Sequence, residues 1–163
     1  MKSRVKALAA LAAAGVAGIA MPAYAQVTME RLVNPEPENW LIYGGNLSNW
    51  RYSTLDQINR DNVGDLEVKY MFQLGGRSTG GTLAAKEEGV ILADGGYLYT
   101  TDTWARLMKW DVTSGDRATP LWRFNPEITK SRTQRGPFLY DDGLFIGTND
   151  TRLIRVNTDS GEV

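Results

Sequence analysis

The side chains of this chain that could do chemistry are carboxylates, hydroxyls, guanidiniums and amines, because its 163 residues include no His and no Cys. Without His the chain lacks the commonest zinc and haem ligand and the usual base of a catalytic triad. Without Cys it can form no disulfide. The charged stretches of interest are Glu87 with Glu88, and Lys130 with Arg132 and Arg135. Any reaction here must use such groups or a bound cofactor.

These charged stretches belong to a chain that repeats itself. Residues 106–115 (RLMKWDVTSG) recur 46 residues later as residues 152–161 (RLIRVNTDSG). A period of roughly 40–50 residues, built from strand-like runs and turn residues, is typical of a β-propeller whose repeats are small antiparallel sheets, called blades. We therefore predict an all-β propeller of four-stranded antiparallel blades. Its function is expected on the propeller axis, between blades.

The strand pattern follows this repeat. In the first repeat we expect strands at residues 90–93, 97–100, 107–110 and 121–124. In the second repeat we expect them at residues 136–140, 144–147 and 153–156. Upstream, residues 26–50 predict a polar lead-in, and the alternating residues 66–72 predict one more half-buried strand.

Residues 1–25 predict a secretory signal peptide, and hence a periplasmic location. Three basic residues precede the apolar run 7–20, and Ala23-Tyr24-Ala25 forms a small-x-small cleavage site. The apolar run is shorter than the roughly 20 residues that a membrane-spanning helix needs, so no membrane span is expected.

Composition and length limit what residues 26–163 can be. They carry 15 Lys and Arg against 19 Asp and Glu, a net charge of −4, which argues against a nucleic-acid partner. Their length holds about three repeats, whereas propellers typically have four to eight blades. The second repeat also stops at residue 163, before its outer strand. We expect the N-terminal part of a longer protein, whose open sheet edges would favour self-association.

Several motifs resemble one known family. The stretch WLIYGGN at residues 40–46 and RYSTLDQIN at residues 51–59 are similar to the opening of the pyrroloquinoline quinone (PQQ)-dependent alcohol dehydrogenases, which include methanol and ethanol dehydrogenases. WDVTSG at residues 110–115, followed by Trp122, resembles that family's tryptophan-docking motif, with Ser114 in place of the usual Thr. In this motif the indole covers a contact between blades.

The resemblance implies an eight-bladed propeller, of which this chain holds about three blades, and it implies PQQ and calcium as cofactors. Glu87 lies seven residues before Asp94, where the family has a Glu that hydrogen-bonds the polar edge of the quinone. Arg135-Gly136 matches the family's Arg-Gly pair, whose Arg binds a PQQ carboxylate. The residues alone also allow a solvated loop acid at Glu87, with Glu88 as the other register, and a solvent-facing basic loop around Arg135.

Two departures from the family qualify this resemblance. Thr129-Lys130 stand where the alcohol dehydrogenases carry two adjacent cysteines, and Val90 replaces a proline. The family's general base and calcium ligands are expected beyond Val163, so the isolated chain should be inactive. The full protein would use a small alcohol and an electron acceptor such as a cytochrome c. The alternative is a non-catalytic propeller that acts as a protein-binding scaffold in the cell envelope.

Overall fold

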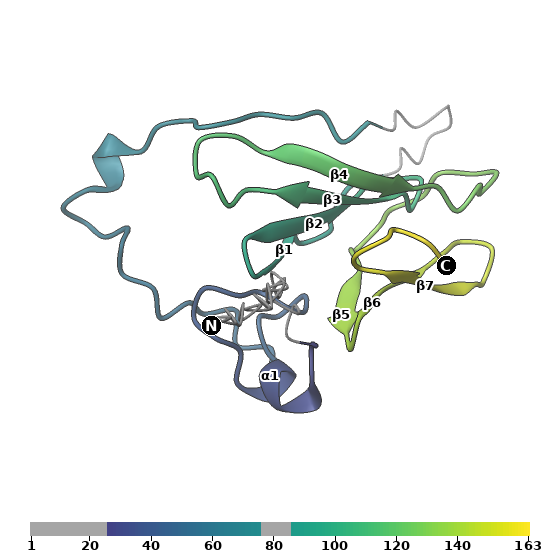
Figure 1. Ribbon diagram of the computed structural model, residues 1–163, viewed down its shortest axis with the longest axis horizontal. Helices are drawn as coiled ribbons and strands as arrows, with labels where there is room; N and C mark the ends of the chain where they lie inside the picture. The colour runs from purple at the N-terminus through teal and green to yellow at the C-terminus, as the bar shows by residue number, and fades with distance from the viewer. Residues whose placement is uncertain (1–25, 76–85) are drawn as a thin grey trace, which may run out of the picture.

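The computed structural model describes residues 26–75 and 86–163, which form two antiparallel sheets (Figure 1). The first sheet consists, in spatial order, of β1 (Leu92–Asp94), β2 (Tyr97–Thr101), β3 (Leu107–Asp111) and β4 (Thr119–Phe124). The second consists of β5 (Phe138–Tyr140), β6 (Gly143–Gly147) and β7 (Leu153–Asn157). Every strand predicted within the two repeats is therefore confirmed. Residues 26–75 contribute no third sheet.

The repeat in the sequence is also a repeat in strand register. In the first sheet Leu92 pairs with Tyr99, and Tyr99 pairs with Lys109. In the second sheet the residues 46 positions later make the same pairs, Phe138 with Phe145 and Phe145 with Arg155. Because side chains alternate between the two faces of a strand, equal registers place equivalent residues on equivalent faces. Each repeat is thus one structural unit.

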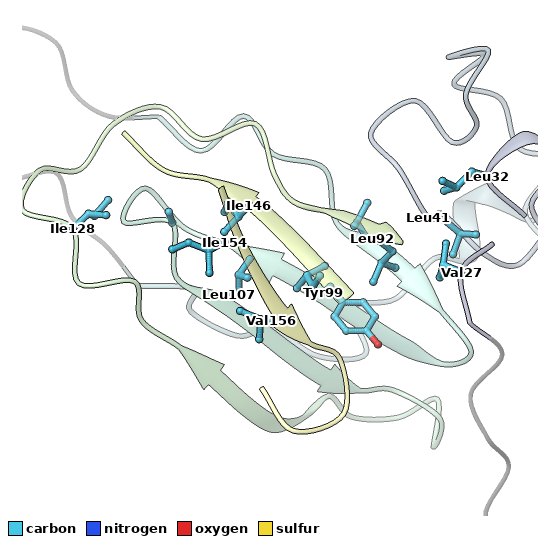
Figure 2. Close-up of a cluster of buried hydrophobic side chains, with 13 residues drawn as sticks. Val27, Leu32, Leu41, Leu92, Tyr99, Leu107, Ile128, Ile146, Ile154 and Val156 are labelled. Atoms are coloured by element: carbon cyan, nitrogen blue, oxygen red, sulfur yellow. The ribbon is translucent and has the colours of Figure 1, made fainter. Parts of the chain in front are cut away.

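A single apolar core lies between the two sheets (Figure 2). Tyr99 and Leu107 contribute to it from the first sheet, and Ile146, Ile154 and Val156 contribute from the second. All five side chains are buried. Burial of this apolar surface holds one sheet against the next.

The contact predicted for Trp122 is confirmed at the rim of this core. Its indole hydrogen-bonds the carbonyl of Thr158 in the turn after β7, and its ring lies against Gly161 in the same turn. The tryptophan-docking motif therefore joins the two repeats.

The lead-in pairs with β1 and with the residue that follows β5. It contains one short helix that was not predicted, α1 (Met29–Val33), whose N-cap Thr28 accepts a hydrogen bond from a backbone N–H of the helix. Further along, Trp40 makes an antiparallel bridge to Ala93, with N···O distances of 2.8 and 3.0 Å between their backbone atoms. Val27 bridges Asp141 in the same manner.

The prediction of a strand at residues 66–72 is wrong. This segment follows the short 3₁₀ helix η1 (Val63–Asp65) and runs extended, without a partner strand in the described part of the chain. Val68 is 79% exposed, whereas Phe72 stacks on Trp110 with the ring centroids 4.0 Å apart. An alternating pattern shows that a segment can form a strand, but the strand also needs an edge to pair with.

Within residues 26–75 and 86–163, the structure has no helix long and apolar enough to cross a membrane.

Candidate functional site

The two predicted site residues lie on the segments that lead into the first strand of each sheet. Glu87 precedes β1 and Arg135 precedes β5. Their segments run in parallel, with a bridge between Glu87 and Gln134. The N–H of Glu88 donates to the Gln134 carbonyl at 2.9 Å, and the N–H of Gln134 donates to the Lys86 carbonyl at 3.1 Å. The structure therefore brings the predicted acid and the predicted guanidinium onto neighbouring segments.

The close approach of these segments explains the glycine after Arg135. Gly136 has a φ of +95°, and a Cβ there would lie 3.3 Å from both the backbone N and O of Val90. On the facing segment, a Cβ at Gly89 would lie 3.1 Å from the backbone N of Gly136. A side chain at either position would push the two segments apart.

The Glu87 carboxyl is held by its own segment. Its Oε1 accepts a hydrogen bond from the N–H of Gly89 at 3.0 Å. The residue as a whole is exposed, but its carboxyl is partly desolvated. This desolvation, aided by the negative charge of Asp102 and opposed by the Gly89 hydrogen bond, raises the pKa of Glu87 to about 7. Near neutral pH Glu87 can therefore act as a hydrogen-bond donor or as an acceptor.

Arg135 is an accessible cation at the edge of the site. Its side chain is 77% exposed, and its Nη2 lies 3.6 Å from Oε2 of Glu88. Such an exposed ion pair stabilises a fold by no more than about 1 kcal/mol, so exchanging it for another carboxylate costs little. A guanidinium in this setting can bind a ligand carboxylate through two parallel hydrogen bonds.

The structure adds a charged group that the sequence analysis missed. Asp102, directly after β2, is buried and accepts hydrogen bonds from the backbone N–H groups of Trp104 and Arg106, at 2.9 and 3.2 Å. It also forms ion pairs with the side chains of Arg106 and Arg123. The Glu87 segment enters the sheet at the start of β1. Because β2 runs antiparallel to β1, β2 ends at this same end of the sheet, and Asp102 follows it there.

The positions of the missing cysteines lie in an exposed bend. Thr129 and Lys130 both have exposed side chains, and the carbonyl of Lys130 accepts a hydrogen bond from Nδ2 of Asn149 at 3.3 Å. Among the described residues, no three or more Asp and Glu side chains gather in a group that could hold a metal ion. The part of the site that the structure shows is therefore one acid, one guanidinium and the backbone between them.

Sheets repeated at one register around a shared core, with the entry loops of their first strands side by side, define part of a β-propeller. The match to a known family agrees with this class. Residues 40–163 match the family described as PQQ, "Glucose/ethanol/alcohol dehydrogenase, beta-propeller domain". The chain belongs to this family of PQQ-dependent dehydrogenases.

Individual bacterial relatives support membership in this family. The dehydrogenase subunit of the quinone alcohol dehydrogenase of Acetobacter aceti is 32% identical, over 95% of this chain and 22% of that protein. The quinone 1-butanol dehydrogenase of Thauera butanivorans is 32% identical, over 99% of this chain and 27% of that protein. The chain thus spans about a quarter of the length of these relatives.

Solved structures show the same fold. The chain is similar to a europium-containing methanol dehydrogenase with a TM-score of 0.68 at 22% identity, covering 82% of this chain and 23% of the other. The quinohemoprotein alcohol dehydrogenase from Comamonas testosteroni has a TM-score of 0.64 at 26% identity, covering 77% and 18%. This structural similarity supports the predicted propeller fold.

Proposed function

We propose that this chain is the N-terminal part of an exported quinoprotein dehydrogenase that oxidises alcohols with PQQ and calcium. Residues 1–25 would be a cleaved signal peptide that directs the protein to the periplasm, and residues 26–163 would form the first blades of an eight-bladed ring. The observation that carries the proposal is the parallel pairing of the Glu87 and Arg135 segments before β1 and β5. In this proposal, both groups would lie on one wall of a site between blades.

The residues of this wall fit PQQ, which carries three carboxylates. The exposed guanidinium of Arg135 would bind one of them, since its present partner Glu88 is a weakly held carboxylate at 3.6 Å. Glu87 would hydrogen-bond the polar edge of the quinone. The pKa of about 7 allows the Glu87 carboxyl to be neutral beside an anionic cofactor. When bound, PQQ supplies the two-electron acceptor for alcohol oxidation.

Other parts of the catalytic machinery would come from outside residues 26–163. In this proposal the calcium ligands and the general base belong to later blades, so the isolated chain binds PQQ weakly and does not turn over. The full protein would take a small alcohol and pass electrons to an acceptor such as a cytochrome c. The isolated chain would self-associate through its open sheet edges.

A second candidate, a non-catalytic propeller that serves as a protein-binding scaffold, is favoured by one observation. The positions of the family's cysteine pair are Thr129 and Lys130, both exposed here. A site without the family's two adjacent cysteines would need other residues to hold the cofactor.

The two candidates differ in one assay on the full-length protein, purified and loaded with PQQ and Ca²⁺. Alcohol-dependent reduction of an artificial dye is expected for the dehydrogenase. Arg135→Ala should lower this activity by at least about tenfold at limiting PQQ, because a bidentate charged contact is lost. Arg117→Ala, in the β3–β4 turn at the opposite end of the sheet, is the matched control. No activity and no PQQ uptake by the wild-type protein would support the scaffold.

A further inference from the structure

The buried carboxylate of Asp102 organises a turn beside the candidate site. Its side chain is 2% exposed, and Nε of Arg106 donates to its Oδ2 at 2.6 Å. Nη2 of Arg123, from β4, lies 3.8 Å from the same oxygen. With the two backbone N–H donors of Trp104 and Arg106, Asp102 fixes the turn at residues 102–106 from both sides.

The propeller repeat does not require this buried acid. The repeat equivalent of Arg106 is Arg152, 46 residues later, which makes its ion pair with Asp150. Asp150 is 45% exposed and lies two residues from its partner, whereas Asp102 is buried and lies four residues from Arg106. The three strands of the second repeat therefore keep the register of the first repeat without a buried carboxylate at this turn. The cost of burying Asp102 points to a local role in the first repeat.

That role concerns the loop that carries Arg135. The carbonyl of Thr103, next to Asp102, accepts a hydrogen bond from the N–H of Arg132 at 3.0 Å. Two residues later, Gln134 makes the parallel bridge to Glu87. An unbroken series of contacts thus leads from the buried carboxylate through the Thr103 carbonyl to both site segments.

We propose that Asp102 is a positioning residue for the wall formed by Glu87 and Arg135. It fixes the 102–106 turn, the turn anchors the Arg132–Arg135 loop, and its negative charge acts on the Glu87 carboxyl. Its role toward PQQ rests on the proposed function, whereas its action on Glu87 and on the loop does not.

Two measurements on the cofactor-free 163-residue chain test the inference. The first follows the ¹³C resonance of the Glu87 carboxyl against pH. The charged groups around this carboxyl are Glu88 and Lys86 beside it, Arg135 on the neighbouring segment, and Asp102 with its partners Arg106 and Arg123. Asp102→Asn removes one negative charge and leaves both guanidiniums, so the titration midpoint of Glu87 should fall below about 7, while desolvation keeps it above the ordinary 4.5. Asp150→Asn, in the second repeat, should leave it unchanged.

The second measurement is amide hydrogen exchange at Glu88 and Gln134, whose N–H groups join the two segments. Asp102→Ala removes the acceptor of the Trp104 and Arg106 N–H groups, so exchange at both amides should accelerate at least about tenfold. Exchange in β6 and β7 should not change. Asp102→Asn keeps an acceptor oxygen and should accelerate exchange less. It also carries the test if the alanine variant does not fold.

An unchanged Glu87 titration in Asp102→Asn, or equal exchange at Glu88 and Gln134 in the wild type and Asp102→Ala, would overturn the inference. Failure of the proposed function gives a different pattern. In that case PQQ binding to the full-length protein would be insensitive to Arg135→Ala, while the Asp102 variants would still shift the cofactor-free readouts.

Discussion

The indole Nε1–H of Trp122, in β4, donates to the carbonyl oxygen of Thr158, in the turn after β7, at an N···O distance of 3.0 Å. Nζ of the buried Lys109 donates to the same oxygen at 2.9 Å. The Trp122 ring also lies against Gly161, where a Cβ would come within 2.8 Å of its ring atoms. One turn of the second sheet thus receives two side chains of the first, which ties the repeats together.

Trp122→Ala should destabilise the chain by about 2–4 kcal/mol, because it removes a large partly buried aromatic and leaves the Thr158 carbonyl with one donor fewer. The free energy of unfolding from urea denaturation measures the effect. Trp50→Ala is the control, since Trp50 is 72% exposed and should change stability by no more than about 0.5 kcal/mol. Equal effects of the two substitutions would contradict the docking role.

Because of Lys109, the free energy of unfolding of the chain should increase as the pH rises above neutrality. Burial lowers the pKa of its amine below the ordinary 10.5, so holding the charged form in the fold is costly at neutral pH. As the pH rises toward 10.5, the folded state loses this proton before the unfolded state does, and wild-type stability rises. Lys109→Met lacks this rise. The free energies of unfolding of the wild type and Lys109→Met, from urea denaturation, should differ by one amount at pH 7 and by another at pH 10. The same difference at both pH values would refute the lowered pKa of Lys109.

Ionisation of Glu87 should lower the stability of the chain as the pH rises, whereas loss of the Lys109 proton raises it at higher pH. Its folded pKa of about 7 lies above the ordinary 4.5, so its contribution to stability is complete below pH 4.5 and is lost as the pH rises through 7. Glu87→Gln cannot ionise and keeps its stability. We expect nearly equal melting temperatures at pH 4 and a higher melting temperature for Glu87→Gln at pH 8. A difference in melting temperature between the wild type and Glu87→Gln that does not depend on pH would mean that the Glu87 carboxyl is not desolvated.

Gly136 should be intolerant of a side chain. Gly136→Ala places a Cβ 3.3 Å from the Val90 backbone at a φ of +95°, which should cost about 1–3 kcal/mol and loosen the bridge between Glu87 and Gln134. Gly64→Ala is the matched control, because a Cβ there would have no atom within 4 Å. Thermal melts together with amide exchange at Gln134 check the prediction. A Gly136→Ala variant as stable as Gly64→Ala would contradict the close approach of the segments.

The repeat allowed the strands of both sheets to be predicted, because a 46-residue period carries register as well as composition. Prediction failed where structure depends on a partner. Residues 66–72 alternate like a strand but find no edge to pair with in the described part of the chain. The helix Met29–Val33 was missed because its five residues are too few for a periodic pattern.

The candidate site was predictable in part. Resemblance to the family's motifs suggested Glu87 and Arg135, and the structure brings their segments side by side. Asp102 could not be identified in this way, because one of its partners, Arg123, lies 21 residues away on β4. A local signal did exist in Asp102 and Arg106, an acid and a base four residues apart just after a strand.

The most direct test of the central claim is an equilibrium titration of the full-length protein with PQQ in the presence of Ca²⁺, followed by quenching of Trp fluorescence. The wild type should bind one PQQ per chain. Arg135→Ala should weaken binding at least about tenfold, and Arg117→Ala should match the wild type. Binding that is equally tight in all three proteins would contradict the assignment of Arg135, and the absence of PQQ binding in the wild type would contradict the proposed dehydrogenase itself.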